Sequence, residues 1–89
     1  MRFKREGGRA GVIKYVSGDQ AGELEWEMLV GPFDFVIYGA SCRWLRPESR
    51  AMTNTEVLAL AQEISDEWSV RIDAAFSDGS EDVRPRGAV

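Results

Sequence analysis

The sequence predicts a small α+β domain, in which an antiparallel β-meander of about four strands is followed by one α-helix packed on one face and a closing strand. Two patterns predict this class. Apolar and polar residues alternate along residues 23–30, and apolar residues recur at helical spacing after residue 53. A chain of 89 residues fits one domain with a single hydrophobic core. We therefore expect one domain over residues 1–76 and a disordered tail over residues 77–89, where the composition is typical of turns and disorder.

The first two predicted strands cover residues 2–6 and 9–17. They flank Gly7-Gly8, a glycine pair typical of a hairpin turn. In the second strand Ile13 and Tyr15 share one face, which we expect to lie toward the core because Lys14 marks the other face as solvated. Residues 17–22 have the composition of a loop.

The central predicted strand, residues 23–30, alternates cleanly, and Gly31-Pro32 ends it. The next strand is expected over residues 35–44, and Gly39 within it indicates a bulge or a close backbone contact. Both strands place an apolar row toward the helix, Leu24, Trp26, Met28 and Val30 in the first and Val36, Tyr38, Ala40, Cys42 and Trp44 in the second.

Matching these apolar faces sets a register in which Glu23 lies opposite Arg43 and Leu29 opposite Ile37. On the other side, matching Trp26 with Ile13 places Glu25 opposite Lys14. Glu23, Glu25 and Glu27 then form the solvated surface of a sheet. Only Glu27 then lacks a basic partner. The alternative, a carboxylate row for metal binding or acid–base chemistry, is disfavoured because partnered, exposed carboxylates are poor acids and bases.

The predicted helix begins after Thr53, which forms a capping-box pattern with Glu56. It extends for 14–15 residues, and its apolar stripe contains Val57, Leu60, Ala61, Ile64 and Trp68. Residues 70–76 alternate again as a closing strand. That strand either runs parallel to a neighbour or crosses to the far edge of the sheet, and the sequence leaves both arrangements open.

Two residue types limit the possible chemistry. The chain has one cysteine, Cys42, and no histidine. An internal disulfide, a Ser-His-Asp or Cys-His mechanism and a histidine-based zinc site are therefore excluded. No other catalytic signature is present, so we expect a protein that is not an enzyme, without a metal, a cofactor or a catalytic residue.

The formal net charge is −4, and an acidic chain is poorly suited to nucleic acid as its main ligand. A weak nucleic-acid or small-molecule binder stays as an alternative because the N-terminal segment is basic. No apolar run is long enough to cross a bilayer, and the N-terminus lacks the apolar region of a signal peptide. We expect a cytoplasmic location and no membrane partner.

Two surfaces are candidate binding sites. The first is apolar and is expected on the face opposite the helix, as an interface for a protein partner or a second subunit of a homodimer. Packing by a terminal strand or the tail is the alternative. The second is a basic-aromatic patch suited to an acidic partner or a phosphate, unless its arginines simply border a loop. The first surface contains Leu29, Phe33, Phe35, Ile37 and Glu27, and the second contains Arg43, Trp44, Arg46 and Arg50.

Three short segments, Phe3-Lys-Arg-Glu-Gly-Gly-Arg9, Phe35-Val-Ile-Tyr38 and Trp44-x-x-Pro47, are followed by Thr53 and a helix. Together they resemble a pattern in bacterial immunity proteins, which are small cytosolic proteins that neutralise secreted polymorphic toxins. The similarity covers about residues 3–76. It implies a non-enzymatic protein that binds a toxin domain, often a basic nuclease, and an acidic strand would suit such a partner. The resemblance assigns no binding residues.

Overall fold

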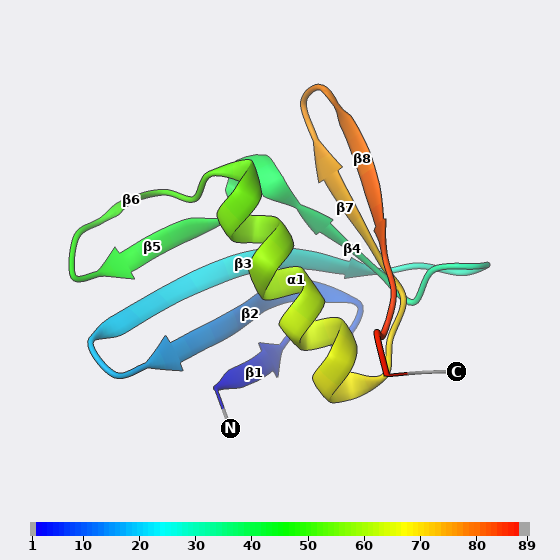
Figure 1. Cartoon of the computed structure of the whole chain (residues 1–89), viewed down its shortest axis with the longest axis horizontal. Coiled ribbons are helices and arrows are strands. Elements are labelled where there is room, and N and C mark those ends of the chain that lie inside the picture. The colour runs from blue at the N-terminus through cyan, green and yellow to red at the C-terminus, as the bar shows by residue number, and fades with distance from the viewer. Residues whose placement is uncertain (1, 88–89) are drawn as a thin grey trace.

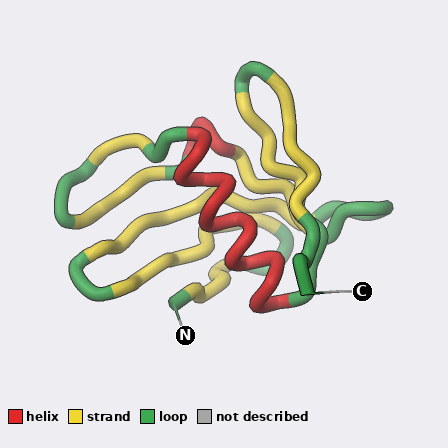
Figure 2. The backbone as a smooth tube through the Cα atoms, in the orientation of Figure 1, coloured by secondary structure: helices red, strands yellow, loops and turns green. Residues whose placement is uncertain are grey.

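A computed structural model describes residues 2–87 of the chain. The elements in this range, shown in Figures 1 and 2, are eight strands, one short 3₁₀ helix and one α-helix. Their bounds are β1 Phe3–Glu6, β2 Ala10–Ser17, β3 Gln20–Met28, β4 Phe35–Tyr38, η1 Gly39–Ser41, β5 Arg43–Arg46, β6 Arg50–Ala51, α1 Asn54–Trp68, β7 Ile72–Phe76 and β8 Gly79–Val83.

The strands form one open sheet in the order β1-β2-β3-β4-β7-β8, and β5 pairs with β3 and β6. All pairs are antiparallel except β4 with β7. Helix α1 lies across one face of this sheet (Figure 1). The predicted α+β class is therefore confirmed, and the closing strand runs parallel to β4. No helix within residues 2–87 is long and apolar enough to cross a membrane.

The hydrophobic core lies between α1 and the sheet. Helix α1 contributes Val57, Leu60, Ala61 and Ile64, as its apolar spacing predicts. The capping box is present, because the Thr53 hydroxyl accepts from the Glu56 amide and the Glu56 carboxylate accepts from the Thr53 amide. Large sheet residues that are fully buried under the helix are Phe3, Ile13, Leu24, Trp26, Ile37 and Ile72.

The prediction of a single strand over residues 35–44 is wrong, because η1, which begins at Gly39, separates β4 from β5. Trp26 faces Ile37, whereas Glu23 faces Arg43. Three residues along β3 thus correspond to six along the opposing segment, and η1 takes up the three extra residues. Side chains along a strand alternate between the two faces of the sheet, so an offset of three residues turns every side chain of β4 to the face opposite the predicted one.

The ends of β3 also differ from the prediction. The strand begins at Gln20 and ends at Met28. Met28 is 44% exposed and Val30 lies fully exposed in the following loop, so neither belongs to the core. Only Leu24 and Trp26 of the predicted apolar row are buried there.

The β2–β3 register is two residues away from the predicted one. Ile13 faces Leu24, and Lys14 faces Glu23. The cause is the hairpin turn, which is only Gly18-Asp19 because Ser17 already pairs with Gln20. Gly18 has a φ of 59°, as the first central position of a type II′ turn requires.

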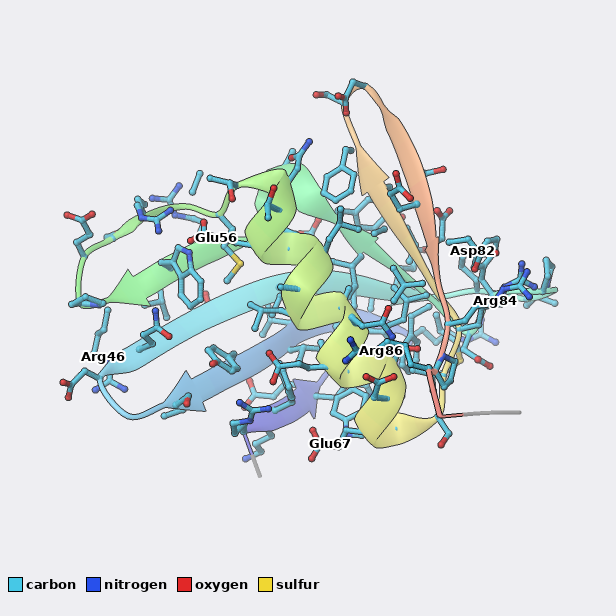
Figure 3. The ribbon with its side chains drawn as sticks, in the orientation of Figure 1. Arg46, Glu56, Glu67, Asp82, Arg84 and Arg86 are labelled. Atoms are coloured by element: carbon cyan, nitrogen blue, oxygen red, sulfur yellow. The ribbon has the colours of Figure 1, made fainter. Side chains whose placement is uncertain are left out.

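Strand β8 and contacts of Arg86 with α1 lie in the segment where a disordered tail was expected. Strand β8 pairs with β7, and Val83 is buried in the core. Figure 3 shows Arg84 beside Asp82, and Arg86 against α1, where its guanidinium pairs with Asp66 at 2.7 Å. Because only one side chain of β8 enters the core, the strand lacks an apolar pattern. Residues 88–89 of the predicted tail lie outside the described residues.

Candidate protein-binding face

The first predicted interface is not formed. Phe35 and Ile37 are 5% and 0% exposed, because the reversed alternation of β4 turns them toward α1. Leu29 and Phe33 are half-buried in the loop between β3 and β4, and Phe33 lies under the Arg71 guanidinium. Glu27 points to the opposite face of the sheet. These five residues therefore share no common surface.

The second predicted patch is formed only in part. Trp44 is 7% exposed, and Arg50 lies over its ring at 6.0 Å. Arg50 is also paired with Glu56 at 2.8 Å and with Glu48 at 3.8 Å. Arg43 and Arg46 remain exposed and make no ion pair within residues 2–87. Of the four predicted residues, only Arg43 and Arg46 are therefore available to a ligand, because Trp44 is buried and Arg50 is paired with Glu56.

The Glu56 carboxylate explains why Arg50 is occupied. Arg50 donates two hydrogen bonds to it, at 2.9 and 2.8 Å. These bonds, followed by the Thr53 amide, hold the pKa of Glu56 well below its usual range. The Trp44 indole N–H meets no acceptor at hydrogen-bond distance among the described residues, although it lies close enough to Glu56 to help lower this pKa. The helix cap and the end of the sheet are thus joined through one carboxylate.

The face of the sheet that points away from α1 is termed the open face. Side chains that pair across strands share a face, so the registers define its rows. One row contains Lys4, Lys14, Glu23 and Arg43. A second row contains Ala10, Glu27, Val36 and Asp73, and Glu25 lies opposite Val12 in the row between them.

The open face carries its negative charge around Tyr38, and Glu25, Glu27, Tyr38 and Asp73 are together termed the acidic patch. Tyr38 donates a hydrogen bond to the Glu27 carboxylate. This bond raises the pKa of the phenol, and the charges of Glu25 and Asp73 raise it further. None of the three carboxylates has an ion-pair partner in the described part of the chain.

The register predicted for β2 and β3 gave no sign of the acidic patch, because it placed Lys14 opposite Glu25. Glu23 does lie opposite Arg43, as expected, and also faces Lys14. The two-residue shift removes Lys14 from Glu25, which faces Val12 instead, and Lys14 forms an ion pair with Glu6 at 3.5 Å. The basic neighbours are therefore gathered around Glu23, and Glu25 keeps an uncompensated charge.

A shallow hollow of about 350 Å³ adjoins the acidic patch. It is lined by Ala10, Gly11, Val12, Glu25, Trp26, Glu27 and Tyr38. Apolar atoms of β2 thus lie beside carboxylates of β3. This combination can receive the stem and head of a lysine or arginine side chain, since both have an apolar stem and a cationic end.

Other reactive groups are few. Cys42 is buried, and desolvation raises the pKa of its thiol to about 11. Its sulfur donates to the Tyr38 carbonyl at 3.3 Å. Within residues 2–87, no three Asp, Glu or Cys side chains are grouped closely enough to hold a metal ion together.

Comparison of the chain with models of protein families, with curated proteins and with solved structures gives no match.

Proposed function

We propose that this protein is a non-catalytic protein-binding module that holds a basic partner against the acidic patch of its open face. The observation that carries this proposal is the set of uncompensated carboxylates of Glu25, Glu27 and Asp73 around Tyr38. Like charges on one face of a sheet repel each other, and a cationic partner relieves that repulsion.

The composition of the patch also supports protein binding. Tyrosine is enriched at protein interfaces because its ring is apolar and its hydroxyl is polar. Tyr38 is half-buried, and its hydroxyl holds Glu27 in place before any partner arrives. A preorganised side chain loses less conformational entropy on binding.

The charge argues against a homodimer formed through this patch. In a two-fold dimer the same surface faces its own copy. With the two-fold axis through the acidic patch, the carboxylates of Glu25, Glu27 and Asp73 in the two copies would face one another, and their repulsion disfavours that arrangement. A partner of opposite charge fits better.

The resemblance to immunity proteins gives the proposal a more specific form, in which the partner is a basic toxin domain. Positive charge on such a partner complements the acidic patch and would accelerate association. The cytoplasmic location expected from the sequence belongs to the same proposal.

A pull-down from an extract of the source cells tests this function. The bait is the tagged full chain as wild type, as Glu25→Lys/Glu27→Lys, and as the matched control Glu48→Lys/Asp78→Lys. Both double variants change the net charge equally, and all four positions are exposed. We expect one basic protein to be retained by wild type and control and lost by the Glu25/Glu27 variant. Equal retention by all three baits would refute the proposal, with circular dichroism confirming that each bait is folded.

A further inference from the structure

A second surface lies at the β1 edge of the sheet, on the helix side. It is a groove of about 610 Å³ lined by Phe3, Lys4, Arg5, Phe35, Trp68 and Val70. The Trp68 ring stands edge-on to both Phe3 and Phe35, with centroid distances of 6.5 and 6.4 Å. The end of α1 and the starts of β1 and β4 therefore build an aromatic wall that the acidic patch does not use.

Arg5 supplies a fixed cation at this groove. Its guanidinium lies over the rings of Trp26 and Phe35, at 4.9 and 5.5 Å from their centroids. Its side chain has no hydrogen bond or ion pair with any residue between 2 and 87. Stacking holds the planar group while leaving its N–H donors free, and such donors match a carboxylate in a two-pronged geometry.

The nearest acidic side chains of α1 are largely occupied elsewhere. Glu63 pairs with Arg2, and Asp66 pairs with Arg86. Glu67, the exposed carboxylate of this helix end in Figure 3, is grouped with these four residues around a separate hollow. The charge of Arg5 is therefore available to a ligand.

Strand β1 also offers backbone groups at its free edge. The Val16 amide donates to the Arg2 carbonyl at 2.9 Å, so residues 2 and 16 form a hydrogen-bonded pair. In an antiparallel ladder such pairs alternate with pairs whose backbone groups point away. Phe3 and Arg5, which face Tyr15 and Ile13, therefore turn their N–H and C=O groups outward.

We infer that the β1 groove binds an extended, acidic segment of a partner protein, which adds to β1 as a further strand. An apolar side chain of that segment lies against the half-buried Trp68 and Val70, and a carboxylate on the same side of the segment binds Arg5. Strand addition of this kind uses backbone bonds for affinity and pockets for specificity. Arg2, Lys4 and Arg5 make this edge basic, which disfavours pairing with the β1 of a second copy. This site goes beyond the proposed function, because it lies on another surface and selects the opposite charge.

The probe is a nine-residue peptide, acetylated and amidated at its ends, with the central sequence Glu-Thr-Leu-Thr-Glu. Leucine and both glutamates then lie on one side of the extended peptide, so either strand direction presents a carboxylate to Arg5. One control peptide replaces both glutamates with lysine. A second control is N-methylated at its five central residues and cannot donate to the β1 edge.

Titration into the ¹⁵N-labelled full chain is followed by NMR with wild type, Arg5→Gln and the matched control Arg43→Gln. We expect the glutamate peptide to shift the Phe3 and Arg5 amides and the Trp68 indole, and to slow hydrogen exchange at Phe3 and Arg5. We expect Kd to rise about tenfold in Arg5→Gln and to stay unchanged in Arg43→Gln. Neither control peptide should bind.

Three results would overturn the inference. One is the absence of these shifts at about 1 mM peptide, the weak end of specific affinities. Another is equal affinity in wild type and Arg5→Gln. The third is a dimer in size-exclusion chromatography, with the same two amides protected without peptide, which would assign the edge to a second copy. The acidic patch is tested separately by its own variants, so failure at β1 does not bear on it.

Discussion

Tyr38 of β4 donates its phenolic hydrogen bond to the carboxylate of Glu27 on β3. The bond fixes the centre of the acidic patch, and it follows from the β3–β4 register, in which Glu27 faces Val36 and Trp26 faces Ile37. A tyrosinate cannot donate this bond, so the pKa of Tyr38 is raised.

Glu27→Gln should lower the pKa of Tyr38 toward its ordinary value of 10.0. The substitution removes the strongest acceptor and the nearest negative charge. The pKa is measured by NMR of ¹³C-labelled tyrosine, which separates Tyr38 from Tyr15. Glu48→Gln, a change in a remote loop, is the control and should leave the titration in place. An unchanged Tyr38 pKa in Glu27→Gln would show that the bond does not form.

Thr53→Ala should lower the free energy of unfolding by about 1 kcal/mol, the usual effect of losing a helix N-cap. The hydroxyl of Thr53 accepts from the Glu56 amide at 3.2 Å and has no substitute in alanine. Urea denaturation measures the change. Thr55→Ala, two residues further into the helix, is the control and should be nearly neutral. Equal effects of both substitutions would argue against the capping box.

Gly39→Ala should destabilise the fold by about 1–3 kcal/mol, as expected for overpacking. A Cβ atom at Gly39 would lie 2.6 Å from Phe76 Cε1 and 3.1 Å from the Ala75 carbonyl oxygen, so the Phe76 ring must move and the backbone at Ala75 must shift slightly. Gly8→Ala, where no atom lies within 4 Å, is the control and should change stability by less than about 0.5 kcal/mol. Thermal unfolding of both variants tests whether η1 packs on β7.

Acid should weaken the link between Arg50 and Glu56. The pKa of Glu56 is lower in the folded protein than its ordinary value of 4.5, so the stabilisation is complete above that pH and is lost as pH falls. Arg50→Gln should raise the Glu56 pKa and reduce the loss of stability between pH 7 and pH 3. Side-chain ¹³C NMR and urea midpoints measure the two effects. Arg46→Gln is the control, and a Glu56 pKa equally changed by both variants would contradict the pairing.

Local patterns predicted much of the fold. The β1–β2 hairpin, the capped helix and the buried faces of Ile13 and Ile64 follow from spacing within one segment. The errors concern long-range pairing. One 3₁₀ turn reversed β4 and buried Phe35 and Ile37, and one short hairpin turn moved Lys14 away from Glu25. Strand β8 was missed because its pairing with β7, rather than apolar periodicity, holds it.

Of the four residues of the acidic patch, the sequence pattern pointed only to the two glutamates. Glu25 and Glu27 alternate visibly along β3, but Tyr38 and Asp73 join them through β3–β4 and β4–β7 pairing. The acidic patch joins strands whose members lie 11 (Glu27 to Tyr38) to 48 (Glu25 to Asp73) positions apart in sequence, and the offsets between these strands depend on turn lengths. Patterns within one strand do not fix those offsets.

The most direct test of the central claim is carboxylate footprinting of the full chain, alone and in complex with the protein captured in the pull-down. Carbodiimide coupling to glycine amide labels accessible carboxylates, and mass spectrometry measures each site. We predict that labelling of Glu25, Glu27 and Asp73 falls severalfold in the complex, while labelling of Glu48 and Asp78 is unchanged. Equal labelling of Glu25 and Glu27 in the free and bound protein would contradict the account.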